Sequence, residues 1–179
     1  MRLTLLLVTV FAIGATALPM TNRIESAGPP VPSGDQLKPM PAINLKDFNG
    51  KAINQEEFRD KVVLFDFWAT WCAPCITEIP FLNRLHEKYA NRGFKVVGVT
   101  LVSGNADEVK PFVSRLKMVY PVVMGDDDQA YELNIMAFPT SYLVTRDWKI
   151  HRRFIGAGPS KGQQMEAEIS KLLDESPTN

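Results

Sequence analysis

The chain has 179 residues, of which 45% are hydrophobic, so it can bury a core and form one domain of ordinary size behind a leader. Its 20 Lys and Arg residues balance its 20 Asp and Glu residues, and the formal net charge is zero. This balance argues against a nucleic-acid-binding protein, which usually carries a net basic charge or a basic stripe. It also gives no sign of electrostatic steering toward acidic partners.

The first 41 residues have the pattern of an export signal followed by a spacer. Arg2 precedes an apolar run over residues 3–18, and Ala15-Thr16-Ala17 supplies the small residues of a signal-peptide cleavage site after Ala17. The alternative is an uncleaved membrane anchor, although the run is slightly short for a full span of about 20 residues. We therefore expect residues 1–17 to be a signal peptide or anchor, and the Pro-rich residues 18–41 to be a linker.

A globular domain is expected over residues 42–174, before a short polar tail at 175–179. Asn49-Gly50 between short apolar segments indicates a hairpin. Residues 62–68 are apolar except for Asp66, which is typical of a strand buried on both faces. A helix then begins at a C-x-x-C motif and ends at Gly93. A second buried strand at 94–101 completes a parallel β-α-β unit.

The second half of the domain alternates between helical and extended patterns. Residues 105–116 have helical periodicity, and Asn105 with Glu108 resembles a capping box. Pro111 inside this stretch implies either a later helix start or a kink. The remaining patterns predict strands at 121–124, 140–144 and 149–155, and helices at 126–133 and 160–173.

The two cysteines of the chain, Cys72 and Cys75, carry the expected chemistry. An exported protein meets an oxidising compartment, and a bridge that closes so small a loop adds little stability, so a structural staple is a weak explanation. Cys72 lies where the strand ends and the helix begins, where free N–H groups and the helix dipole favour a thiolate. The thiolate is the nucleophile of disulfide exchange. We therefore expect Cys72 to attack and Cys75, one turn further along, to resolve the mixed disulfide.

Asp66 is the second candidate for chemistry. A carboxylate within an apolar strand is costly to bury, and desolvation raises its pKa. Beneath the cysteines, such an acid could accept the Cys75 proton during resolution. The alternative is an Asp at the edge of the sheet that bonds to backbone groups.

The segment from Asp66 to Cys75, Asp-Phe-Trp-Ala-Thr-Trp-Cys-Ala-Pro-Cys, resembles the thioredoxin active-site signature. Pro80 matches the helix-kinking proline of thioredoxins, and 138–140 (Phe-Pro-Thr) resembles the cis-Pro-Thr loop. The resemblance covers about residues 42–173. Within the superfamily the chain resembles the TlpA/ResA-type branch because of its leader and spacer, its Glu78, and the extra helix and strand at 104–124.

The resemblance implies an α/β fold of the thioredoxin type. The expected fold is a central mixed sheet flanked by helices, with an N-terminal hairpin extension and a helix–strand insertion after the first β-α-β unit. It also implies that the bond before Pro139 is cis, and that the backbone around Phe138 pairs with an extended substrate segment.

Further site residues follow from the same resemblance. Glu78 resembles a helix glutamate that handles protons; the alternative is an exposed acid that favours the helix dipole. Trp68 is expected to pack in the core. The residues expected to face the substrate are Trp71, Ala73, Pro74, Phe138 and Pro139.

The predicted function is a thiol–disulfide oxidoreductase that reduces disulfides of exported proteins in the periplasm or cell envelope. No His lies between the cysteines, and in oxidising members of the superfamily a His there stabilises the thiolate, so its absence favours reduction. The resemblance implies a membrane thiol-reducing electron donor, and no cofactor or metal is expected. Residues 134–138 lack the pattern of dedicated cytochrome c assembly members, so that role stays open.

Four other functions are alternatives to this one. A disulfide oxidase or isomerase has the same motif. A zinc or copper chaperone is disfavoured because His86 and His151 fit no ligand spacing with the cysteines, and His151 with Arg152, Arg153 and Lys161 suggests an exposed basic surface. A peroxide-reducing enzyme would carry Thr at position 69, where this chain has Ala. A scaffold without turnover would have lost a cysteine.

Overall fold

The computed structural model describes residues 37–175. The predicted leader, residues 18–36 of the predicted linker, and residues 176–179 lie outside the described residues, so those boundaries remain predictions. Within residues 37–175, no helix has the length and apolar character needed to cross a membrane.

The centre of the fold is a five-stranded sheet in the order β3-β2-β1-β4-β5. Its strands are β1 (Val62–Trp68), β2 (Phe94–Thr100), β3 (Val122–Met124), β4 (Thr140–Val144) and β5 (Ile150–Ile155). β1, β2 and β3 are parallel, whereas β4 is antiparallel to both β1 and β5. The predicted mixed sheet is therefore confirmed. Every residue of β1 is buried, as its nearly continuous apolar pattern predicts for a strand in the middle of a covered sheet.

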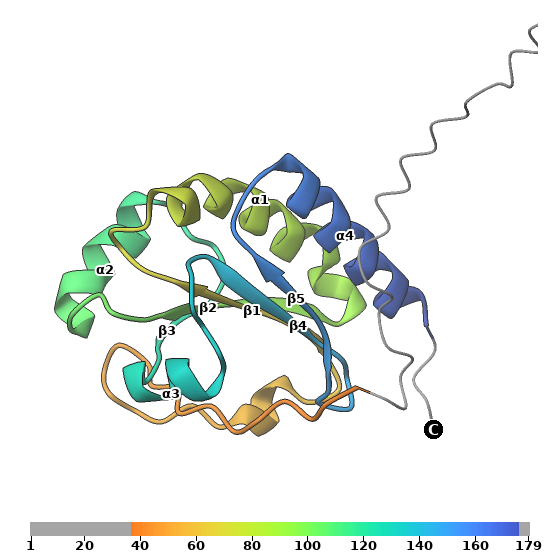
Figure 1. The fold of residues 1–179 in the computed structure, drawn as a ribbon, viewed down its shortest axis with the longest axis horizontal. Coiled ribbons are helices and arrows are strands. Elements are labelled where there is room, and N and C mark those ends of the chain that lie inside the picture. Colours follow the sequence, from red (N-terminus) through yellow and green to blue (C-terminus); the bar gives the residue numbers. More distant parts are fainter. Residues whose placement is uncertain (1–36, 176–179) are drawn as a thin grey trace, which may run out of the picture. The chain divides into compact units, whose positions relative to one another are not determined.

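Helices cover both faces of this sheet (Figure 1). The longer helices α1 (Ala73–Tyr89) and α4 (Pro159–Asp174) lie on one face, together with α2 (Ala106–Arg115). The short helix α3 (Asp127–Glu132) and the N-terminal segment with the 3-10 turn η2 (Gln55–Phe58) lie on the other. The two faces hold separate hydrophobic clusters, because alternate residues of β1 point to opposite sides.

The N-terminal segment is less regular than the predicted hairpin. Lys46 forms isolated antiparallel bridges with Ala52 and with Met124 of β3, and Gly50 adopts the left-handed conformation (φ 81°) in the tight turn between Lys46 and Ala52. The segment therefore folds back on itself once and attaches to the free side of β3, without forming a two-stranded ribbon. Met40 is buried, and its amide donates to the Trp148 carbonyl at 2.9 Å.

The capping box predicted before α2 is confirmed, and it decides where this helix begins. The Asn105 side chain accepts from the Glu108 amide, and the Glu108 carboxylate accepts from the Asn105 amide. α2 starts at Ala106 and continues through Pro111, so a later start is wrong. α1 runs into the 3-10 turn η3 (Ala90–Arg92) and ends at Gly93 (φ 79°), as the sequence predicts.

Candidate active site

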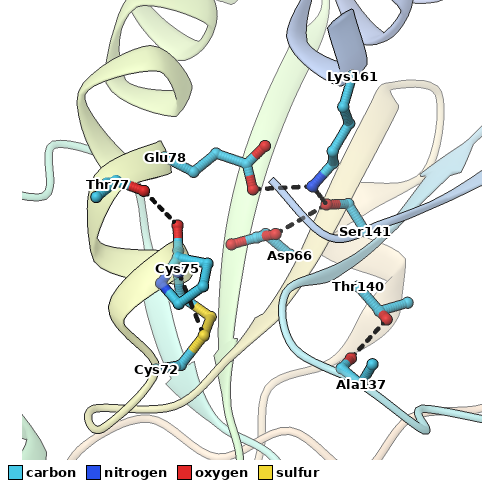
Figure 2. Close-up of polar contacts among 10 residues, drawn as sticks. Asp66, Cys72, Cys75, Thr77, Glu78, Ala137, Thr140, Ser141 and Lys161 are labelled. Carbon is cyan, nitrogen blue, oxygen red and sulfur yellow. Dashed lines mark hydrogen bonds and ion pairs between the residues drawn. A yellow bond between two sulfur atoms is a disulfide. The ribbon is translucent and has the colours of Figure 1, made fainter. Parts of the chain in front are cut away.

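The two cysteines form a disulfide at the junction of β1 and α1 (Figure 2). Cys72 is the N-cap of α1, and its sulfur accepts from the Cys75 amide at 3.2 Å. Pro74 occupies the first turn, where a missing N–H costs little. Both cysteines are buried, with exposed fractions of 4% and 2%. The strand end and the helix start thus place the pair at the free N–H groups of α1.

A groove beside the disulfide separates it from the loop before β4. The Phe138–Pro139 peptide is cis, as predicted. Phe138 lines the groove, but Pro139 does not. The lining residues are Trp71, Cys72, Ala73, Pro74, Ile135, Met136, Ala137 and Phe138. Four of the five residues predicted to face the substrate therefore share one surface, and most of that surface is apolar.

Trp71 forms one wall of this groove. Its side chain is 64% exposed, and its indole Nε1 donates to the Val102 carbonyl at 2.8 Å. The ring meets that of Phe138 edge-to-face, with 5.7 Å between the centroids. The indole is therefore held in place while its face remains open to a partner. Trp68, in contrast, is 1% exposed and packs in the core as predicted.

Asp66 lies in β1, the central strand, and is 3% exposed. Its Oδ1 accepts from the Ser141 hydroxyl of β4 at 2.8 Å. The alternative of an edge-strand Asp bonded to backbone is therefore wrong. Burial and, to a smaller extent, the nearby charge of Glu78 raise the pKa of Asp66 to about 7, against the opposing effects of Lys161 and the Ser141 hydrogen bond.

Glu78 is buried on the inner side of α1, at 6% exposure. Its Oε2 accepts from the Lys161 ammonium at 2.8 Å, and burial raises its pKa while Lys161 lowers it. The alternative of an exposed acid at the helix start is wrong. The spacing carried this signal, because Cys75, Glu78, Ile79 and Leu82 fall at i, i+3, i+4 and i+7 of one buried face.

Sequence reasoning missed two members of this cluster and misplaced a histidine. Ser141 and Lys161 were not predicted as site residues, and Lys161 was assigned to a basic surface; its side chain is 9% exposed. Alternation in β4 could have indicated that Ser141 and Leu143 share a face. His151 is buried at 8%, and its Nε2 lies 2.8 Å from Glu168 Oε2, so its predicted exposure is wrong.

Within residues 37–175, no group of three or more His, Cys, Asp and Glu side chains is arranged to hold a metal ion. The two histidines have other partners. His86 Nδ1 accepts from the Val96 amide at 3.2 Å, and His151 pairs with Glu168. The chemistry that the arrangement offers is dithiol–disulfide exchange next to two buried acids.

Comparison with known proteins agrees with this chemistry. The family model described as Redoxin matches residues 33–173. The chain belongs to the Redoxin family. This redoxin is 30% identical over 141 residues to the thiol-disulfide oxidoreductase ResA of Bacillus thuringiensis subsp. konkukian, covering 76% of this chain and 75% of the relative.

Solved structures show the same similarity. A thiol:disulfide interchange protein DsbE from Chlorobium tepidum superimposes with a TM-score of 0.71 at 27% identity, covering 79% of this chain and 99% of that chain. StoA from Bacillus subtilis gives a TM-score of 0.57 at 26% identity, with coverages of 72% and 96%. The redoxin therefore has a thioredoxin-like fold of the TlpA/ResA type and is a thiol–disulfide oxidoreductase, which confirms the predicted fold and enzyme class.

Proposed function

We propose that this redoxin reduces disulfides of exported proteins, with Cys72 as attacking thiol and Cys75 as resolving thiol. The observation that carries the proposal is the Cys72–Cys75 pair at the start of α1, beside an apolar groove and near the buried carboxyl of Asp66. The Cys72 thiolate attacks a substrate disulfide, forming one mixed disulfide and releasing one substrate thiolate. Cys75 then attacks the Cys72 sulfur, which breaks the mixed disulfide and releases the second thiolate.

The resolving step requires a base for the Cys75 proton. Asp66 suits this role because its pKa of about 7 lets it gain and lose a proton near neutral pH. The group is shielded from solvent, and β1 leads directly into the loop that carries Cys72. Asp66 therefore takes the Cys75 proton during resolution and returns it when the disulfide is reduced again. Glu78 is the second acid of the same cluster and adjusts the charge around Asp66.

The surroundings of the cysteines favour reduction over oxidation. Strongly oxidising dithiols owe their potential to a stabilised thiolate. Within residues 37–175, the Cys75 amide is the one hydrogen-bond donor to the Cys72 sulfur, and Pro74 brings no amide hydrogen to the first turn. The buried cation of the nearby acid cluster, Lys161, is paired with Glu78, so it offers little stabilisation to a thiolate. The Cys72 thiolate is therefore stabilised less than in an oxidant that has a His between its cysteines, and the disulfide form of this enzyme is the favoured product.

The groove supports binding of an extended segment around the substrate cysteine. Within the described residues, no hydrogen bond uses the amide of Ala137 or Phe138, so both can pair with a peptide backbone. Trp71 and Met136, at 64% and 76% exposure, offer apolar contact on either side. Ala73 and Pro74 line the groove next to Cys72, and the cis residue Pro139 lies between Phe138, which lines the groove, and the start of β4.

Each turnover leaves the enzyme oxidised, so a reductase needs a dithiol donor. We assign this role to a membrane thiol-reducing partner, because an oxidising compartment supplies none. Residues 1–17 would direct export to the periplasm or cell envelope, and 18–41 would link an uncleaved leader to the domain.

A trapping experiment tests the assigned roles. Cys75→Ala removes the resolving thiol, so mixed disulfides with partner proteins accumulate on Cys72 and disappear on treatment with dithiothreitol. Cys72→Ser is the matched control and forms none. If the Cys75→Ala protein captures no partner, or if Cys72→Ser captures as many, the assignment of attacking and resolving thiols is wrong.

A further inference from the structure

A lysine is buried among the acids that lie close to the disulfide. Lys161, in the first turn of α4, is 9% exposed and donates to Glu78 Oε2 at 2.8 Å and to the Ser141 hydroxyl at 3.3 Å. Ser141 in turn donates to Asp66 Oδ1 at 2.8 Å. Figure 2 shows this chain running from α4 to the carboxyls beside the cysteine pair. A buried ammonium is costly unless paired, so the site needs at least one carboxylate opposite it.

The close packing of α4 on α1 brings Lys161 within hydrogen-bonding distance of Glu78. The next residue, Gly162, faces Phe81 of α1, and a Cβ at Gly162 would lie only 3.3 Å from the Phe81 ring. Without that side chain the two helices approach closely. The lysine can therefore extend along the contact to Glu78, 83 positions earlier in the chain.

Glu78 and Asp66 have hydrogen-bond partners of different charge. Glu78 meets the ammonium directly, whereas Asp66 meets it only through the neutral hydroxyl of Ser141. One cation thus faces two carboxyl groups, and the cluster is neutral when Glu78 is ionised and Asp66 protonated. The other titratable groups near it are Cys75 and the Tyr120 phenol. Burial, with the charges of both acids, raises the pKa of Tyr120 well above its usual value and keeps the phenol neutral.

We propose that Lys161 is a positioning residue of the exchange reaction, which holds Glu78 as a carboxylate and so leaves Asp66 as the one buried acid that exchanges a proton with Cys75. This inference rests on the proposed function. In the resolving step the Cys75 S–H bond breaks and its proton goes to the Asp66 carboxylate. The Cys75 sulfur bonds to the Cys72 sulfur, and the Cys72–substrate bond breaks with its electron pair on the departing thiolate. The enzyme dithiol is oxidised and the substrate disulfide reduced.

The test follows the pH dependence of resolution in a single turnover, starting from the mixed disulfide on Cys72. Resolution speeds up as Asp66 ionises, with a midpoint near pH 7 in the parent protein. Lys161→Met removes the opposing cation, so the midpoint rises by about one unit and the rate at pH 7 falls roughly five-fold. Lys161→Arg keeps the charge and restores the parent midpoint.

Charge compensation distinguishes positioning from a packing role. Glu78→Gln removes a negative neighbour and lowers the midpoint. The double variant Lys161→Met/Glu78→Gln removes both charges and returns the midpoint toward the parent value. If Lys161→Met alone does not fold, comparing the double variant with Glu78→Gln still tests the effect of Lys161. The double variant leaves neither member of the Lys161–Glu78 ion pair buried without its partner, and the rise of its midpoint above that of Glu78→Gln measures the effect of Lys161.

Lys88→Met is the matched control. Lys88 also joins α1 to α4, by an exposed ion pair with Glu166 at 2.7 Å, and lies outside the acid cluster. It should leave the midpoint unchanged. The inference is overturned if the Lys161 variants keep the parent midpoint, or if the double variant does not rise above Glu78→Gln. Either result leaves the proposed function standing, whereas a parent protein that forms no mixed disulfide removes the proposed function itself.

Discussion

At the scale of single residues, the proposed proton transfer depends on side chains that are costly to bury. Asp66 is the clearest example, because burial and then the charge of Glu78 raise its pKa, while its hydrogen-bond partner in β4 is a neutral hydroxyl. Such perturbed groups cluster at functional sites. Burial of Asp66 lowers the stability of the folded protein and gives it a carboxyl group that titrates near neutral pH.

The raised pKa of Asp66 should make the free energy of unfolding depend on pH. The folded-state pKa of Asp66, about 7, lies above its ordinary value of 3.8, so its contribution to folding is most favourable below about pH 4 and declines as pH rises to 7. Asp66→Asn removes this penalty. At pH 8 we expect the oxidised variant to be more stable than the parent by about 4 kcal/mol, with the difference vanishing near pH 4. Urea unfolding at both pH values measures it; equal differences at the two pH values would contradict the assignment.

The same substitution should harm turnover. Without a carboxylate to take the Cys75 proton, Asp66→Asn resolves mixed disulfides on the order of 10²-fold more slowly at pH 8. The resolution rate of this variant should also no longer increase with pH around pH 7. Stopped-flow reduction of a peptide disulfide follows both effects, with Asp47→Asn, at a surface turn, as the control. An unaltered rate across pH would remove Asp66 from the mechanism.

Trp71 should matter for exchange with protein disulfides and much less for exchange with small disulfides. Trp71→Ala removes one wall of the groove, so we expect exchange with a protein disulfide to slow about ten-fold while exchange with a small disulfide changes little. Comparing kcat/KM for the two substrate types tests this. Equal losses for both would place Trp71 in the chemistry of Cys72 and not in the binding of the substrate.

At the scale of elements, the loop between β2 and α2 supports the segment that carries the cysteines. The Ser103 hydroxyl accepts from the Thr70 amide at 2.9 Å, and the Val102 carbonyl accepts from Trp71. The capping box at Asn105 fixes where this loop ends, and Val109 of α2 packs in the cluster that holds both cysteines. Through these contacts, the place where α2 begins helps to position the loop that carries Cys72.

Gly104 tests this link. A Cβ there would lie 1.8 Å from Glu108 Oε2, and Gly104 has φ 80°, so Gly104→Ala displaces the capping carboxylate in addition to straining the backbone. Gly156 has φ 78° and open space around it, so Gly156→Ala is a control for the strain alone. We expect Gly104→Ala to lower the free energy of unfolding by about 1 kcal/mol more than Gly156→Ala. Equal losses in thermal or urea unfolding would contradict the role of the cap.

At the scale of the whole molecule, local patterns predicted the sheet well. The buried run of β1 and the turn at Gly93 are encoded in consecutive residues, and the motif around Cys72 marks one strand–helix junction. The Glu78–Lys161 pair was not predictable in this way. Its partners are far apart in sequence, and the contact depends on how closely α4 packs on α1. His151 was misplaced for the same reason, since its partner Glu168 lies on another element.

The reduction potential of the Cys72–Cys75 pair in the purified protein shows whether this enzyme is a reductant or an oxidant. The protein is equilibrated in dithiothreitol or glutathione buffers, and the fluorescence of Trp71, next to the disulfide, reports the fraction reduced. We expect a potential below about −230 mV, as for a reductant. A value near −120 to −180 mV would make the protein an oxidase or isomerase and would contradict the account.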